Sequence, residues 1–447
     1  MGIRQLFAGD DSRTIKAKKN IYISFGIKAA DTFMYLLLVP LTLGYLNEYE
    51  YGIWLTINSI LMWINSFDIG LGNGLRNKLA EALAKDDKQL CKEYVSTTII
   101  MLLFIMLLLL FGGLLISCFI DWYNVLGVSQ SAVEDLDQII FVSYGFFCLN
   151  FVLKIIGSIY LALQLSAVNN LFTCLSHAIA LLAIFILTKT TDGSLMYVAI
   201  AYSAAAPLAY LLAFPFTFLG KYSFMSPSLT CFRKKLLGSL FSMSILFFVI
   251  QLGSLLLFST ANLIISHMFG PDKVTPYNIA YKYFSLITIA ISLIIVPMWS
   301  ATTDAYASGD MEWIKITIRK INKMLCACLL TMFCMVAISP LVYSVWIGNT
   351  VVIPFKMTVL VAMYIYVLLF SMTYSYFLNG MGFLMIQSIN TVIVGILFIP
   401  MSICLGKIIG LYGVIVALLL ANVSGALLNY IQFNKIIFGT AKGIWLK

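Results

Sequence analysis

The chain has 447 residues, of which 61% are hydrophobic and 11% are charged, and its mean hydropathy is +0.97. A soluble domain has about 45–50% apolar and about 25% charged residues, so this composition excludes a soluble protein and indicates an integral membrane protein. The net charge of +9 does not predict nucleic-acid binding, because the sequence offers no basic folded face.

Twelve apolar segments are long enough, at about 20 residues or more, to cross a bilayer as helices. They cover residues 20–44, 51–70, 95–119, 138–163, 167–188, 195–219, 239–269, 276–298, 320–346, 353–378, 385–406 and 410–433. The connections between them are too short to form another folded domain. The sequence therefore predicts an all-α polytopic membrane protein.

The basic residues lie mostly on one side of these predicted spans. With the amino terminus in the cytoplasm, 21 Lys and Arg residues flank the inner ends, and only Lys189, Lys273 and Lys407 flank the outer ends. The positive-inside rule then places both termini in the cytoplasm, which requires an even number of spans. Residues 1–19 are basic and amphipathic, and we expect a cytoplasmic segment there rather than a signal peptide.

One polar stretch occurs twice. Residues 81–92 (EALAKDDKQLCK) recur 223 positions later as residues 304–315 (DAYASGDMEWIK). Each copy follows a pair of apolar segments on the predicted cytoplasmic side. We expect each copy to form an amphipathic helix along the membrane surface, the first over residues 79–90. The spacing predicts two six-span halves of the same orientation, which is the usual plan of a carrier with a central site.

The predicted organisation follows from this repeat. It consists of a cytoplasmic segment at 1–19, an amino-terminal lobe at 20–219, a cytoplasmic linker at 220–238, a carboxy-terminal lobe at 239–433 and a cytoplasmic tail at 434–447.

The first span contains two charges. Lys28 and Asp31 are three residues apart, so their side chains share one face of the helix. A charge at the bilayer centre costs at least about 2.5–3.5 kcal/mol on the insertion scale. The pair could be a self-contained ion pair that lowers this cost. Alternatively, Asp31 could exchange Lys28 for a proton or a cation during transport.

The second span contains a polar stripe. Asn58, Asn65 and Asp68 recur at spacings that place them on one side of a helix. They could form hydrogen bonds between helices, or they could line a cavity, with Asp68 as a second candidate for ion coupling. We favour the cavity wall.

Two further lysines lie inside predicted spans. Lys154 is about 15 residues into the fourth span, with Asn150 on its face, and could bind an anion or neutralise a carboxylate on a neighbouring helix. Lys282 is about five residues into the eighth span and could instead extend to the outer interface. His177 and His267 are assigned no role, because a lone histidine in a span is as often a packing residue.

Motifs for cofactors and metals were not found. The nine cysteines include no C-x-x-C pair. The stretch Gly70-Leu71-Gly72-Asn73-Gly74 is no dinucleotide fingerprint, because Leu75 stands where the third glycine is required. We therefore expect neither a cofactor nor a bound metal ion.

The first spans resemble those of a known family. The motifs Tyr51-Gly52-Ile53-Trp54, Asp68-Ile69-Gly70-Leu71-Gly72 and Ala80-Glu81-Ala82 are similar to those of Wzx-type polysaccharide repeat-unit flippases. That family belongs to the superfamily that also contains the multidrug and toxin extrusion (MATE) carriers. The resemblance implies two parallel six-helix lobes around a central, V-shaped, cation-lined cavity, with spans 1, 2, 7 and 8 on its walls.

The resemblance also implies a function. It implies a bacterial inner-membrane protein that moves undecaprenyl-pyrophosphate-linked oligosaccharide, such as an O-antigen repeat unit, to the periplasmic leaflet by alternating access. Implied partners are membrane lipid, a polysaccharide polymerase, a chain-length regulator and a coupling proton or sodium ion. The candidate cavity residues are Lys28, Lys154, Lys282, Asn58 and Asn65, with Asp31 and Asp68 for ion coupling. Span 7 carries no basic residue, so no role is transferred to that helix.

Physical chemistry agrees with this interpretation, because a pyrophosphate cannot cross hydrocarbon without buried cations, and lysine is a compact charge suited to phosphate.

The first alternative is a MATE-type antiporter coupled to protons or sodium, although deep lysines would repel cationic drugs. The second is a membrane enzyme acting on lipid-linked glycans. The longest outer connection, residues 120–137, contains four acids but no Lys, Arg or His, so we expect a transporter rather than an enzyme.

Overall fold

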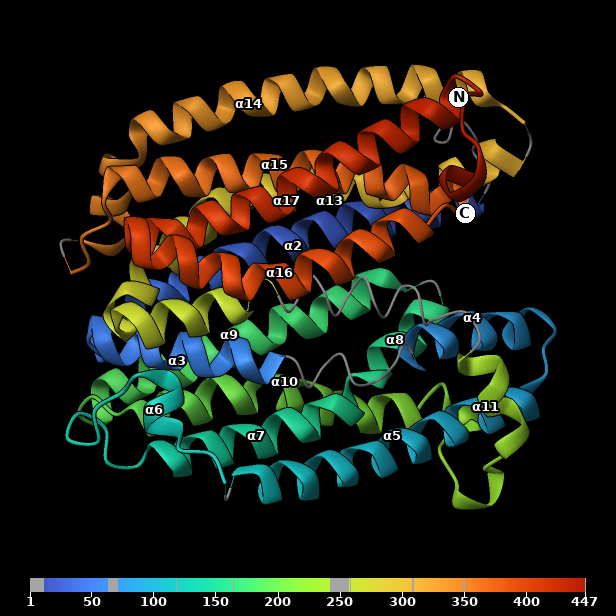
Figure 1. Ribbon diagram of the computed structural model, residues 1–447. Helices are drawn as coiled ribbons and strands as arrows, with labels where there is room; N and C mark the ends of the chain where they lie inside the picture. The colour runs from blue at the N-terminus through green and yellow to red at the C-terminus, as the bar shows by residue number, and fades with distance from the viewer. Residues whose placement is uncertain are drawn as a thin grey trace. The chain divides into compact units, whose positions relative to one another are not determined.

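A computed structural model describes residues 12–62, 71–117, 119–163, 165–241, 257, 259–307, 309–348 and 350–446. Every regular element in these ranges is an α- or 3-10 helix (Figure 1). The chain divides into two compact units, which are residues 1–248 and 249–447. The predicted all-α class is confirmed.

Nine helical segments within the described residues are long and apolar enough to cross a membrane. They correspond to predicted spans 1, 3, 4, 5, 6, 9, 10, 11 and 12. Predicted spans 51–70 and 239–269 include residues outside the described ranges. Predicted span 276–298 lies within α13 (Val274–Ala307), some of whose side chains are also outside the described set. The protein is therefore a multi-pass membrane protein.

The amino-terminal unit contains ten labelled α-helices in the described residues (Figure 1). They are α2 (Ser12–Tyr45), α3 (Glu48–Leu61), α4 (Leu71–Ala84), α5 (Lys88–Ser117), α6 (Trp122–Leu126), α7 (Leu136–Leu153), α8 (Ile155–Ala162), α9 (Ser166–Thr190), α10 (Leu195–Phe218) and α11 (Lys234–Phe241). Two short 3-10 helices, η2 (Ser223–Met225) and η3 (Leu229–Cys231), lie between α10 and α11. Helix α9 packs between α2 and α10, and α10 also packs against α7.

The carboxy-terminal unit starts with a helical segment at 259–269. It continues with η4 (Pro271–Lys273), α13, α14 (Met311–Ile347), α15 (Phe355–Met381), α16 (Met385–Ile409), α17 (Leu411–Ile437) and η5 (Gly443–Leu446). Helix α15 packs against α13 and α17, and α17 packs against α16. In the order of spans, α7, α9 and α10 of the first unit correspond to α15, α16 and α17. The corresponding pairs are also in contact there: α7 packs against α10, and α10 packs against α9. The described residues of the two units thus share these two helix pairings.

The repeated polar stretch folds into the same turn in both units. The backbone N–H of Asp87 donates to Ala82 O at 3.1 Å, and that of Asp310 donates to Ala305 O at 2.8 Å. In each copy the residue before the aspartate has a positive φ, 52° at Asp86 and 76° in the second copy, where a glycine takes its place. This left-handed residue ends one helix so that the next can begin.

The aspartate of each repeat then caps the next helix. Asp87 Oδ1 accepts a hydrogen bond from Leu90 N at 2.9 Å, and Asp310 Oδ1 accepts one from Trp313 N at 3.0 Å. An aspartate in this position satisfies one of the free N–H groups at a helix start. The shared sequence therefore encodes a helix stop followed by a helix start.

One prediction about this region is wrong. Residues 79–90 do not form one surface helix, because α4 ends at Ala84 and α5 begins at Lys88. In the second copy, residues 304–307 are the last turn of α13. The left-handed residue interrupts the periodicity that suggested a continuous helix.

Candidate functional site

A buried carboxylate accepts from two basic groups inside the amino-terminal unit. Asp31 Oδ2 lies 2.8 Å from Lys28 Nζ, and Asp31 Oδ1 lies 2.6 Å from His177 Nδ1. The Asp31 side chain is 4% exposed, whereas those of Lys28 and His177 are 32% and 27% exposed. We call these three residues the ionic cluster. Both distances are those of charge-assisted hydrogen bonds.

The ionic cluster lies near the middle of α9, one of the candidate membrane spans. His177 is eleven residues after Ser166 and thirteen before Thr190, the two ends of α9. At 1.5 Å per residue it is roughly 16 and 20 Å from those ends. A hydrocarbon core is about 30 Å thick, so a helix of this length that crosses it carries His177 near its middle.

Helices α2 and α9 run parallel and in register. The contact between Asp31 and His177 joins residues 146 apart, and so does the 2.7 Å hydrogen bond between Tyr45 Oη and Thr191 Oγ1. Leu38 lies between these two contacts and packs in a core cluster with α9 and α10 side chains. The constant offset over fourteen residues, or roughly 21 Å, means that the ionic cluster belongs to a long interface between parallel helices.

The two bonds of Asp31 differ in what they hold together. Lys28 is three residues away on the same helix, so that bond can persist when helices move. His177 comes from α9, so its bond exists only while α2 and α9 stay together. The Tyr35 ring packs against the imidazole with centroids 5.5 Å apart, which orients it further.

Lys154 stands at a break between helices. Helix α7 ends at Leu153 and α8 begins at Ile155. The Lys154 Nζ lies 5.4 Å from the centre of the Phe151 ring. One turn earlier on the same face, the Oδ1 of Asn150 is buried without a hydrogen-bond partner. An unsatisfied buried amide oxygen is costly, and it makes this part of the helix polar.

Lys282 lies in a buried polar region of the second unit. Lys282 lies on α13 and is 8% exposed. One turn earlier, Asn278 Nδ2 donates to Asn262 Oδ1 at 2.9 Å, and both asparagines are buried. The protein covers Lys282, and whether its amine extends to the outer interface stays a prediction. Asn262 belongs to predicted span 7, so that span does contribute a polar group.

The three predicted residues of the second span are only partly described by the structure. Asn58 is half-buried on α3. Asn65 and Asp68 lie outside the described residues. The structure brings Lys28 and Asp31 together, while Lys154 and Asn58 lie on other helices of the same unit. Within the described residues, no group of three or more His, Cys, Asp or Glu side chains could hold a metal ion.

His177 was missed as a partner of Asp31. In the structure both residues lie fourteen positions before Tyr45 and Thr191 at the ends of their helices, whereas the predicted spans, which end at 44 and 188, gave their depths only approximately. Equal depth allows contact, but it does not reveal which helices are neighbours.

The profile of the polysaccharide biosynthesis protein family matches residues 17–302, which is more than half of the chain. The chain belongs to this family. A relative in Yersinia pseudotuberculosis, provisionally named as an O-antigen export protein, is 21% identical over 369 residues, which are 80% of this chain and 82% of the relative. The resemblance to Wzx-type flippases that the early motifs predicted is confirmed.

Solved MATE transporters share the fold of this family member. An inward-facing multidrug resistance MATE transporter has a TM-score of 0.77 at 16% identity, covering 94% of this chain and 98% of that chain. An outward-facing one has a TM-score of 0.66 at 17% identity, covering 98% of each chain. A transporter of the same superfamily (MOP) from Pyrococcus furiosus, whose binding pocket is reported to have reverse polarity, has a TM-score of 0.63 at 16% identity, covering 98% of each chain. The chain is thus a multi-pass membrane protein of the polysaccharide biosynthesis family with the fold of the MATE transporters.

Proposed function

We propose that this protein is a flippase that moves undecaprenyl-pyrophosphate-linked oligosaccharide, an O-antigen or similar surface polysaccharide repeat unit, from the cytoplasmic to the periplasmic leaflet by alternating access. It would lie in the bacterial inner membrane with both termini in the cytoplasm. Membership of the polysaccharide biosynthesis family supports the substrate class.

The observation that carries the proposal is the charge inside the spans. More than five residues from either end of a predicted span, the sequence has three lysines, Lys28, Lys154 and Lys282, and one carboxylate, Asp31. The interior is therefore net positive. A pyrophosphate carries several negative charges, and its transfer into low dielectric requires compensating cations. A positive interior favours this substrate and disfavours a cationic one.

The ionic cluster offers a way to couple transport to protons. A proton taken up by the Asp31 carboxylate would neutralise the acceptor of both bonds. It would weaken the bond to His177, which joins α2 to α9, and would leave the ammonium of Lys28 available to a phosphate. Loss of the proton would restore the bond. In this scheme Asp31 is the coupling residue, Asp68 remains a second candidate, and Lys28, Lys154, Lys282, Asn58 and Asn65 contact the substrate.

A second function is favoured by a specific observation. A buried carboxylate within a MATE fold would also suit a proton- or sodium-coupled antiporter of small molecules. The two functions predict different phenotypes: loss of a flippase removes surface polysaccharide, whereas loss of an antiporter raises sensitivity to toxic compounds.

The test is complementation of a deletion strain with lysine variants. K28Q, K154Q and K282Q should each reduce surface polysaccharide at normal membrane abundance. K356Q is the matched control, because Lys356 is exposed near a helix start and lies 4.6 Å from the Tyr412 ring centre. Normal polysaccharide in all three test variants would refute the proposed role of the lysines. Normal polysaccharide in the deletion strain, together with drug sensitivity, would favour the antiporter.

A further inference from the structure

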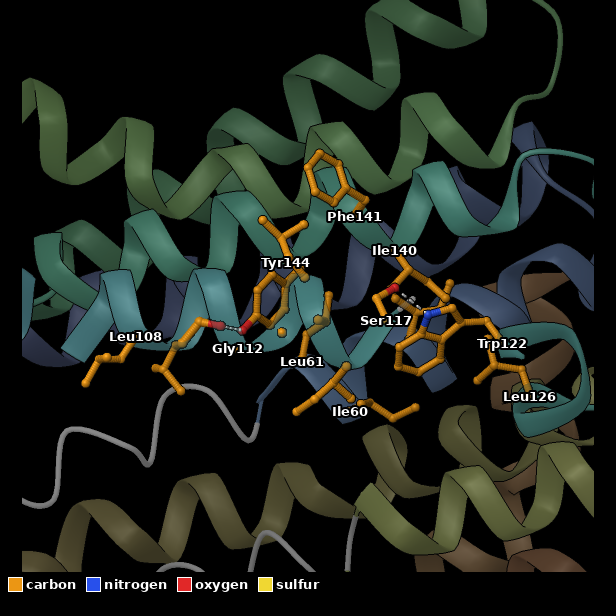
Figure 2. A pocket seen from close by; sticks show the side chains of 15 residues that line it. Ile60, Leu61, Leu108, Gly112, Ser117, Trp122, Leu126, Ile140, Phe141 and Tyr144 are labelled. Carbon is orange, nitrogen blue, oxygen red and sulfur yellow. Dashed lines mark hydrogen bonds between the residues drawn. The ribbon is translucent and has the colours of Figure 1, made fainter. Parts of the chain in front are cut away.

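An apolar groove with a cavity volume of about 320 Å³ lies on the amino-terminal unit, where α3, α5, α6 and α7 meet (Figure 2). It is distinct from the ionic cluster, which none of its lining residues joins. Its walls are mainly Ile and Leu side chains, with aromatic rings from Trp122, Phe141 and Tyr144. Pockets of this size and character bind compact apolar ligands.

The polar groups at the groove are already satisfied. Trp122 Nε1 donates to Ser117 Oγ at 2.9 Å, and Tyr144 Oη donates to the backbone carbonyl of Leu109 (Figure 2). A Cβ at Gly113 would lie 2.2 Å from Tyr144 Oη, so the absence of a side chain there lets the tyrosine pack against α5. The groove therefore offers hydrocarbon contacts and few hydrogen bonds to an occupant.

The groove is about one leaflet deep. Ser117 ends α5, and Leu108 lies nine residues earlier, or roughly 13 Å along the helix. Tyr144 is eight residues after the start of α7 at Leu136, or roughly 12 Å. Half of a hydrocarbon core is about 15 Å. Trp122 lies at the shallow end, where indole rings commonly mark the membrane interface.

The groove opens on the least buried of the described candidate spans. The most apolar stretch of α5 has 6% of its residues buried, the smallest share among the nine described candidate spans. The bordering side chains of Leu108, Ile116 and Phe141 are between 54% and 58% exposed. Exposed side chains on a membrane span face lipid tails, so the occupant of the groove is a hydrocarbon chain.

The negative charge beside the shallow end of the groove determines which lipid headgroup can lie there. Asp121, Glu134, Asp135 and Asp137 are all exposed in or beside the α5–α7 connection, and residues 119–135 include no Lys or Arg. These acids repel an anionic headgroup, including a polyprenyl pyrophosphate, and attract an ammonium group. We propose that the groove binds one acyl chain of an amine-bearing zwitterionic phospholipid in the leaflet that contacts the α5–α7 connection.

Brominated lipids test this proposal through Trp122, because bromine quenches indole fluorescence on contact. The full-length protein is reconstituted in phosphatidylcholine with increasing fractions of brominated phosphatidylethanolamine or brominated phosphatidylglycerol. The Trp122 signal is the difference between the wild type and W122F. We expect half-quenching at a lower fraction of the ethanolamine lipid, by about twofold to fivefold, the range of an exposed ion pair.

Two glycine variants locate the quenching in the groove. Gly112 lines the groove, and a Cβ there has no atom within 4 Å, so G112L places a side chain in the lipid position. Gly145 on α7 also has free space around a Cβ but does not line the groove, so G145L is the matched control. We expect G112L to abolish the lipid preference and G145L to retain it.

Several results would overturn the proposal. Equal half-quenching by the two lipids in the wild type would exclude a selective site, and this comparison needs no groove variant. A preference for phosphatidylglycerol would exclude the ammonium contact. Equal lipid preference in folded G112L and G145L would place the lipid outside the groove.

Discussion

The bond between Asp31 and His177 should hold α2 and α9 together, and a double-mutant cycle measures its strength. The cycle consists of D31N, H177Q and the double variant, each compared with the wild type. A second cycle, D31N with K28Q, is the matched control, because Lys28 bonds the same carboxylate from within α2.

The expected coupling energy follows from burial and charge. A hydrogen bond to a charged group contributes about 1.5–3 kcal/mol and a neutral one about 0.5–1.5 kcal/mol. The Asp31 side chain is 4% exposed but that of His177 is 27% exposed, which lowers the strength of this bond through solvent screening. We therefore expect about 1–2 kcal/mol for the Asp31–His177 coupling. The pair within α2 should couple by about 0.2–0.5 kcal/mol.

The assay is thermal unfolding of the purified protein in detergent. For a unit of about 150–250 residues, 1 kcal/mol corresponds to about 2–4 °C in Tm, so the Asp31–His177 coupling should appear as roughly 2–8 °C. The D31N variant alone should lower Tm most, because it weakens both bonds. Additive effects of D31N and H177Q within about 0.3 kcal/mol would refute the reasoning that this bond holds the two helices together.

Four other substitutions test the fold. D87A and D310A each remove a helix cap and should destabilise the protein by about 1 kcal/mol, to similar extents because the two turns are equivalent; a thermal shift in only one of them would contradict that equivalence. D86G should raise Tm, because glycine adopts the left-handed conformation without the strain that a side chain meets there; an unchanged or lower Tm would contradict this. G74A should destabilise by about 1–3 kcal/mol through overpacking, because its Cβ would lie 2.2 Å from Leu240 O; wild-type unfolding would show that α4 and α11 do not pack this closely.

The membrane spans and the repeat could be predicted because both are patterns of consecutive residues in the sequence. A span is a run of apolar residues, and its length is fixed by bilayer thickness. The offset of 223 residues predicted two like halves, and the matching hydrogen bonds of Asp87 and Asp310 are consistent with it. The turn itself was missed, although Gly309 before Asp310 is a typical helix stop followed by a cap.

The neighbours of the charged residues could not be predicted. Sequence gives the depth of Asp31 and of His177, but contact between them depends on α2 packing beside α9 rather than beside another helix. The burial of Lys282 has the same origin, since it results from packing around α13. Local spacing did predict the Lys28–Asp31 pair, because residues three apart on a helix must be close.

The central claim is most directly tested by following a lipid-linked oligosaccharide across a bilayer. The purified protein is reconstituted in liposomes with undecaprenyl pyrophosphate that carries a fluorescently labelled oligosaccharide, and a membrane-impermeant reductant is added outside. We predict that the protein makes the inner-leaflet label accessible, and that K28Q and D31N slow this step while K356Q does not. Bleaching that stops at the outer-leaflet fraction, as in protein-free liposomes, under imposed proton and sodium gradients as well as without them, would contradict the account.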